Sequence, residues 1–155
     1  MPRGKIQLRQ VNPDLIYNSV AVSKFINHMM KGGKKSASAK IMYKALEIVK
    51  EKSKKNPVEV FETALVNITP QVEVKSRRVG GATYQVPMEV KGNRKNSLGM
   101  RWLLTAARAH KGKPMSDSLS EEILLAFKNE GAAIKKKEDT HRMAEANRAF
   151  AHFAW

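Results

Sequence analysis

The most distinctive chemistry in this sequence is a run of positive charge between Lys91 and Lys113. The segment holds seven lysines and arginines and no aspartate or glutamate: Lys91, Arg94, Lys95, Arg101, Arg108, Lys111 and Lys113. Three of the arginines recur every seven residues, and such positions drift by only about 20° around an α-helix, so they are predicted to form one row. A solvated helix face is the alternative interpretation. Because no acid nearby in the sequence neutralises this run, we expect a phosphate backbone to do so.

A second basic segment surrounds a pair of glycines. Lys75, Arg77 and Arg78 precede Gly80 and Gly81, and Tyr84 follows them. Its ring is of a kind that stacks on a base or on an arginine. A charged edge that deters aggregation is the alternative. The segment is therefore a candidate for nucleic-acid contact.

A third candidate is the pair Lys34 and Lys35, which follows Gly32 and Gly33. The spacing of a phosphate-binding loop of nucleotide hydrolases is missing, and no strand precedes the glycines, so nucleotide hydrolysis is rejected. Two cations on a glycine-flanked turn remain well placed to hold a phosphate.

The residues available for catalysis or metal binding are few. The chain has no cysteine, which excludes disulfides, thiol nucleophiles and cysteine-based zinc sites. Of its four histidines, His141 lies one helical turn from Glu145, but two ligands make a poor zinc site. No nucleophile and base occur at a recognisable spacing. We therefore predict no catalytic residue, no metal ligand and no cofactor.

The overall composition agrees with this interpretation. The chain has 155 residues, 42% of them hydrophobic, and a formal net charge of +15. The length suits one domain with a buried core, while the excess charge favours a polyanionic partner. No apolar run approaches the ~18 residues needed to cross a bilayer, and no signal sequence is visible at the start. We expect a soluble intracellular protein that does not contact a membrane.

The elements that must position these residues are mostly helices. Apolar residues at helical spacing predict six of them, at about residues 20–30, 36–51, 57–69, 94–110, 118–128, and from after the lysines at 135–137 to the terminus. Ser36, Asn56 and Ser118 are the predicted N-terminal caps. Helix 94–110 is apolar around most of its circumference and should be central. The last helix should present Met143 and Phe150 on one stripe, with Phe150 in the core.

Between the third and fourth helices the apolar period changes to two, which predicts a β-hairpin at about residues 72–90. A two-residue glycine turn would place Arg77 opposite Tyr84. A three-residue loop with a bulge would instead gather the valines, Tyr84 and Met88 on one face. The fold class predicted is mainly α: a single domain of about six helices with a two-stranded hairpin. We expect residues 1–18 to form a basic extension that orders on a partner, and residues 19–155 to form a helical RNA-binding domain.

Several long blocks of this sequence match one known family in order. They are DL at 14–15, FIN at 25–27, GKK at 33–35, VKSRRVGG at 74–81, YQVP at 84–87, RWL at 101–103 and KKEDTHRMAEANRAFAH at 136–152. The chain thus resembles the bacterial and organellar form of small-subunit ribosomal protein seven over nearly its whole length. The resemblance implies a protruding hairpin on a helical domain that binds the 3′ major domain of small-subunit ribosomal RNA and nucleates assembly of the subunit head.

The resemblance also implies the partners and the contact residues. The hairpin and the last helix would lie near the exit-site tRNA and the messenger RNA path, and small-subunit proteins nine and eleven would be neighbours, with no homo-oligomer. From the basic segments and the matched motifs together, the candidate RNA-binding residues are Arg3, Lys5, Arg9, Lys34, Lys35, Lys75, Arg77, Arg78, Tyr84, Arg94, Lys95, Arg101, Arg108, Lys111, Lys113, Lys136, Arg142 and Arg148. Trp102 and Phe61 are expected in the core.

The residues alone leave three other hypotheses open. A DNA-bending architectural protein would also be small, basic and helical with a β-ribbon arm, and it would favour duplex DNA. An RNA-processing enzyme would lose turnover on substitution of an acid or a histidine while still binding. Repression of its own messenger RNA is the third, and nothing in the sequence tests it.

Overall fold

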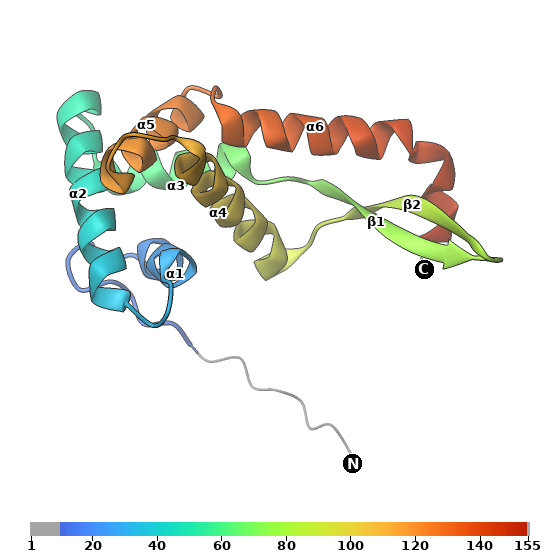
Figure 1. The fold of residues 1–155 in the computed structure, drawn as a ribbon, viewed down its shortest axis with the longest axis horizontal. Helices are drawn as coiled ribbons and strands as arrows, with labels where there is room; N and C mark the ends of the chain where they lie inside the picture. The colour runs from blue at the N-terminus through green and yellow to red at the C-terminus, as the bar shows by residue number, and fades with distance from the viewer. Residues whose placement is uncertain (1–9, 155) are drawn as a thin grey trace, which may run out of the picture.

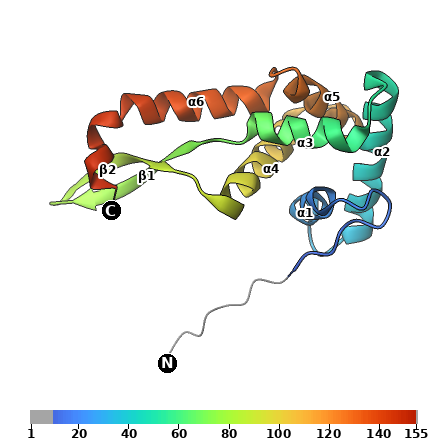
Figure 2. The same cartoon turned by 180° about the vertical axis from the view of Figure 1, so that it is seen from behind.

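The computed structural model describes residues 10–154, which fold into a helical body with one long extension (Figure 1). The elements in chain order are α1 (Val20–Met29), α2 (Lys35–Ser53), α3 (Pro57–Ile68), β1 (Val72–Val79), β2 (Ala82–Glu89), α4 (Gly92–Ala109), α5 (Met115–Phe127), α6 (Ala132–Ala146) and a 3₁₀ helix, η1 (Arg148–Phe153). Helices α1 to α5 form the body, while the hairpin and α6 extend together from one side of it (Figures 1 and 2). The mainly helical fold and the hairpin between the third and fourth helices are confirmed.

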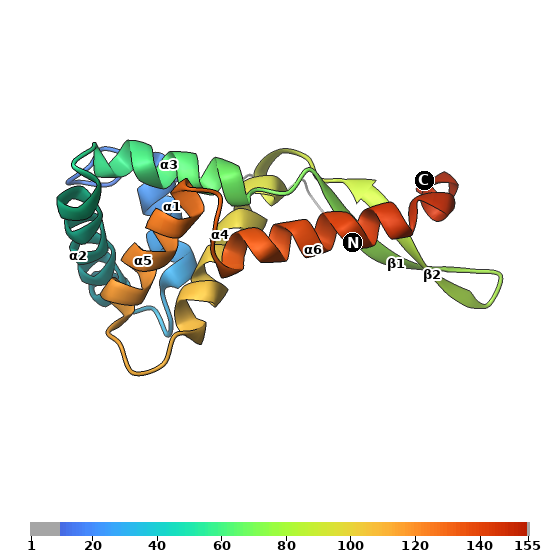
Figure 3. The same cartoon turned by 90° about the horizontal axis from the view of Figure 1, so that it is seen from above.

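The main cluster of buried apolar side chains lies within the body and the first turn of α6, while Val86 on β2 and Ala144 on α6 are buried outside it. The rings of Phe25 on α1 and Phe61 on α3 meet edge to face with centroids 5.3 Å apart, and both side chains are fully buried. Trp102 on α4 is half-buried and packs against this cluster. Only Ala133 and Ile134 of α6 belong to it. The rest of α6 therefore runs outside the body, along the hairpin (Figure 3).

The predicted cap of α3 is confirmed, and two other caps are wrong. Asn56 Oδ1 accepts a hydrogen bond from the backbone N–H of Val58 at 3.1 Å, directly before the proline that opens the helix. Helix α2 begins at Lys35 and α5 at Met115, so Ser36 and Ser118 lie inside their helices. The Ser118 hydroxyl donates to the carbonyl of Pro114. Serine inside a helix can bond back to the preceding turn in this way, so its presence does not by itself mark the start.

The hairpin has the first of the two registers considered. Gly80 and Gly81 form a two-residue turn with φ angles of +57° and +90°, which residues with a side chain rarely adopt. Val79 therefore pairs with Ala82, and Arg77 lies opposite Tyr84. Side chains of directly paired residues share a face, so Lys75, Arg77 and Tyr84 share one face and Arg78 lies on the other.

The C-terminal segment differs from the prediction. The lysines at 135–137 lie within α6 instead of before it, and regular helix ends at Ala146 before η1. Met143 is 48% exposed. Phe150 is not in the core: its ring packs against Tyr84 of the hairpin, with centroids 5.2 Å apart. The hairpin therefore covers the Phe150 end of the apolar stripe and leaves Met143 exposed.

Residues 14–18 are attached to the body through one carboxylate. Asp14 accepts hydrogen bonds from the Tyr43 hydroxyl at 2.7 Å and from the backbone N–H groups of Ile16 and Tyr17 at 3.1 Å. Burial alone would raise the pKa of Asp14, but these hydrogen bonds outweigh it and hold that pKa below its usual value. The hydrogen bond to Asp14, together with burial, raises the pKa of Tyr43 to about 12. The two groups thus form a polar anchor between α2 and the segment before α1.

Candidate nucleic-acid interface

The C-terminal end of α1 brings together basic residues that are distant in the sequence. Arg108 on α4 donates from Nη2 to the main-chain carbonyl of Met29 at 3.0 Å. That carbonyl lies at the end of the α1 dipole, which favours a cation. Lys34 and Lys35 follow within a few residues, and both are exposed. The predicted lysine turn and the end of the predicted arginine row therefore lie close together.

The predicted arginine row runs along α4. Arg94, Arg101 and Arg108 are all exposed on this one continuous helix. Each seven-residue step advances about 10 Å along the axis and returns to nearly the same side. The row thus connects the end of α1 to the base of the hairpin, where α4 begins. Lys95, also on α4, is half-buried, and Lys111 is exposed in the loop after it.

The expectation that the 91–113 run lacks neutralising acids is wrong for three of its cations. Arg94 donates from Nε and Nη2 to the two carboxylate oxygens of Glu73 on β1, at 2.7 Å each. Glu121 binds Lys113 at 2.8 Å, and Glu89 lies 3.7 Å from Lys91. These acids come from neighbouring elements, so a search along the run itself could not find them.

The basic partners of Glu73, at the base of the hairpin, change the pKa of its carboxylate. The hydrogen bond from Arg94, joined by one from Lys75, lowers the pKa of Glu73 in spite of its burial. In the same way the hydrogen bond from Lys113 lowers the pKa of Glu121. Glu73 therefore stays ionised and holds the first turn of α4 against β1 through a two-point contact.

The hairpin presents its cations on both faces. Lys75 and Arg78 are exposed, and Arg77 is half-buried opposite Tyr84. The Tyr84 ring contacts Phe150 and Phe153 of the C-terminal segment, with centroids 5.2 and 5.3 Å apart. In this structure the predicted stacking residue therefore joins the hairpin to η1.

The remaining predicted residues lie on the C-terminal elements or outside the described part. Lys136, Arg142 and Arg148 are exposed, and Arg142 lies 3.9 Å from Asp139. The neighbouring Lys137 instead donates to the carbonyl of Asn67 at the end of α3. The predicted residues Arg3, Lys5 and Arg9 lie outside the described residues.

The histidine considered as a metal ligand has a structural partner. His141 Nε2 accepts a hydrogen bond from the backbone N–H of Gln71, just before β1, at 3.1 Å. Burial and the nearby Lys137 lower the pKa of His141, which keeps this nitrogen free to accept. Within residues 10–154, no three His, Asp or Glu side chains are grouped to hold a metal ion, and no helix is long and apolar enough to cross a membrane.

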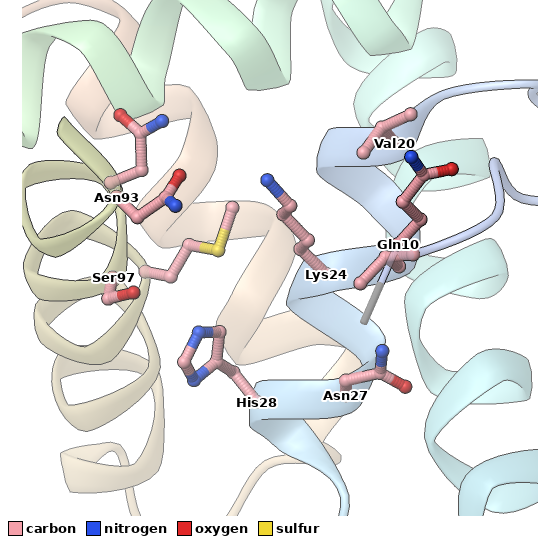
Figure 4. Close-up of a pocket in the computed structure, with 10 residues that line it drawn as sticks. Gln10, Val20, Lys24, Asn27, His28, Asn93 and Ser97 are labelled. Carbon is pink, nitrogen blue, oxygen red and sulfur yellow. The ribbon is translucent and has the colours of Figure 1, made fainter. Parts of the chain in front are cut away.

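One feature of this surface was not predicted. A cleft of about 620 Å³ separates α1 from the first half of α4 (Figure 4). Lys24 and His28 line it from α1, and Asn93 and Asn96 line it from α4, on either side of Arg94 in the sequence. Lys24 and the two asparagines belong to no basic run, aromatic pair or metal-ligand spacing, so the sequence patterns did not mark them. The spacing of the two asparagines, one turn apart beside an arginine, was the available signal.

Comparison with known proteins identifies the family. A family described as ribosomal protein S7p/S5e matches residues 1–148. The curated relatives include small ribosomal subunit protein uS7 of Thermosipho melanesiensis, 61% identical, and uS7 of Thermotoga maritima, 56% identical, each aligned over the full length of both chains. Agreement at this level over every element described above is far beyond a likeness of fold. The chain belongs to the ribosomal protein S7p/S5e family.

Proposed function

We propose that this chain is a structural RNA-binding component of the small ribosomal subunit, without enzymatic activity. It binds the 3′ major domain of the small-subunit ribosomal RNA, nucleates assembly of the subunit head, and so resides in the ribosome, in the cytoplasm. The family and the names of the curated relatives support the subunit assignment.

The observation that carries the RNA assignment is the set of exposed cations that lack an acidic partner. Within residues 10–154, six exposed cations have no carboxylate within ion-pair distance: Lys34, Lys35, Arg78, Arg101, Lys111 and Arg148. Arg101 is the middle arginine of the α4 row, between Arg94, which pairs with Glu73, and Arg108, which donates to the Met29 carbonyl. With a net charge of +15 on the chain, RNA phosphates are the natural counter-charge.

The mechanism follows from where these cations lie. The α1–α2 turn, the α4 row and the hairpin offer separate groups of cations, held at fixed distances by the helical body. Such a surface clamps phosphates of several RNA helices that would otherwise repel one another. Because the major groove of A-form RNA hides base edges, most of this recognition depends on RNA shape.

The extension formed by the hairpin, α6 and η1 supports the assignment of further neighbours. It projects from the body, so it can contact molecules beyond the RNA junction that the body binds (Figure 1). We assign the exit-site tRNA and the messenger RNA path to this extension, and small-subunit proteins nine and eleven to adjoining surfaces. We also assign Arg3, Lys5 and Arg9 to the RNA contact, together with the binding domain of residues 19–155; residues 14–18 are already anchored to the body through Asp14.

The test is binding to the 3′ major-domain junction RNA and to a duplex DNA of equal length, each across a salt series. Preference for the junction RNA that persists at high salt supports the proposal. Equal binding to both, lost together as salt rises, contradicts it and favours an architectural DNA-binding protein.

A further inference from the structure

The cleft between α1 and α4 differs in chemistry from the basic surface around it. None of the residues that line it is acidic, and its polar side chains are mainly amides. It lies beside the segment of α4 between Arg94 and Arg101, within the proposed RNA-binding face. A pure phosphate-binding surface would need several cations there, whereas Lys24 is the one lysine or arginine among the lining residues. The lining therefore indicates a ligand with both donors and acceptors.

The side chains that line the cleft are not used by the protein itself. No other residue between 10 and 154 forms a hydrogen bond or an ion pair with the side chain of Lys24, His28, Asn93 or Asn96. Figure 4 shows the Lys24 ammonium and the His28 ring reaching from α1 toward α4, with Asn93 on the facing helix. Unpaired polar groups that converge on one cavity mark a binding site.

In its neutral form, His28 adds a donor and an acceptor to those of the asparagine amides. Burial, together with the positive charge of Arg101, lowers the pKa of His28 below its usual value. A neutral imidazole presents one N–H donor and one nitrogen acceptor. Apolar side chains also line the cleft: Met100 is 3% exposed and Val20 is 42% exposed. A lining that combines polar and apolar side chains fits a flat heterocycle with polar atoms on its rim.

We propose that the cleft holds an unpaired purine of the bound RNA, with Asn93 and Asn96 on the base edge and Lys24 on its phosphate. An asparagine amide matches the N6 donor and N7 acceptor of adenine in two hydrogen bonds. Proteins recognise RNA sequence mainly at such unstacked bases. The volume of about 620 Å³ lies within the ~300–1,000 Å³ usual for ligand pockets. This inference rests on the proposed function and adds base readout to a surface that otherwise recognises shape.

The experiment combines a protein variant with altered RNAs. The variant Asn93→Ala/Asn96→Ala removes two exposed side chains, and Thr63→Ala, an exposed polar-to-alanine change on α3 away from the cleft, is the matched control. The RNAs are the 3′ major-domain junction and a series in which each unpaired purine is replaced in turn by an abasic nucleotide. Circular dichroism melts verify that both variants fold.

We expect one abasic RNA to bind the wild-type protein about 10-fold or more weakly, the range of a lost two-bond base contact. The double variant should lose the same factor with the intact RNA and nothing further with that abasic RNA. Its salt dependence should match that of the wild type, because no phosphate contact is removed. Thr63→Ala should bind every RNA as the wild type does.

Two results would overturn the inference. The double variant could bind all RNAs as tightly as the wild type, or it could show a shallower salt dependence, which would make the cleft a phosphate site. In either case the wild type would still prefer the junction RNA over duplex DNA, so the proposed function would stand. Loss of that preference in the wild type itself would instead refute the proposed function.

Discussion

The anchor between Asp14 and Tyr43 makes a quantitative prediction about stability. The Tyr43 hydroxyl donates to Asp14 Oδ1 at 2.7 Å, and the other carboxylate oxygen accepts two backbone hydrogen bonds. Asp14 is only 9% exposed, so water replaces these partners poorly when one is removed. We consider the variants Tyr43→Phe, Asp14→Ala and their combination.

The magnitudes follow from the number and kind of hydrogen bonds. Tyr43→Phe removes one bond to a charged acceptor and should lower the free energy of unfolding by about 1.5–3 kcal/mol. Asp14→Ala removes that bond and two others, so its effect should be larger. In the double variant the shared hydrogen bond is lost only once. The combined effect should therefore be smaller than the sum of the two single effects by about the effect of Tyr43→Phe.

The assay is urea denaturation followed by circular dichroism, repeated over a pH series. The pKa of Asp14 is lowered on folding, so its contribution is present above the unfolded pKa near 3.8 and fades as pH falls through the lower folded value. The pKa of Tyr43 is raised from 10.0 to about 12, so its contribution is present below pH 10 and is lost as pH rises through about 12. Additive single effects at pH 7, or an effect of Asp14→Ala that is unchanged at pH 2, would refute the reasoning.

Three further predictions concern the helix packing, the hairpin and the RNA contact. Gly99→Ala on α4 would place the new Cβ 2.9 Å from Thr69 Oγ1. This close contact should lower the free energy of unfolding, measured by urea denaturation, by about 1–3 kcal/mol. In a Thr69→Ala background most of that loss should disappear. Glu73→Gln should speed amide hydrogen exchange in the hairpin at pH 7. The difference from the wild type should shrink below about pH 4.5, because the pKa of Glu73 is lowered from that value and the wild-type carboxylate loses its charge only below it. Exchange in the variant as slow as in the wild type at pH 7 would contradict the two-point contact between Glu73 and Arg94. Arg101→Ala should reduce the slope of log affinity against log salt by about 0.7–0.9, whereas Lys128→Ala, directly after α5, should leave the slope unchanged. A slope for Arg101→Ala equal to that of Lys128→Ala would show that Arg101 touches no phosphate.

Local sequence patterns were sufficient to predict most of the fold. The number and order of the α-helices and the position of the hairpin follow from apolar period and from residues such as Asn56 and Gly80, whose preferences act over a few neighbouring residues. The sequence left two registers of the hairpin open, and the structure decided between them. The same patterns misplaced the starts of α2, α5 and α6. A serine can cap a helix or bond back within it, and packing against the rest of the body decides between the two.

The candidate site, like the fold, could be predicted from the sequence only in part. Positive charge, its spacing on α4 and the family resemblance could all be derived from the chain as written. The partners of those charges could not: Glu73 and Arg94 are 21 residues apart, and Met29 and Arg108 are 79 residues apart. The cleft likewise needs α1 and α4 side by side before Lys24 faces Asn93. By itself the sequence determined which elements form and that the surface is basic, because both depend on short-range preferences and composition. Only the tertiary structure decided which cations are neutralised and where a cavity opens, because both depend on packing between distant segments.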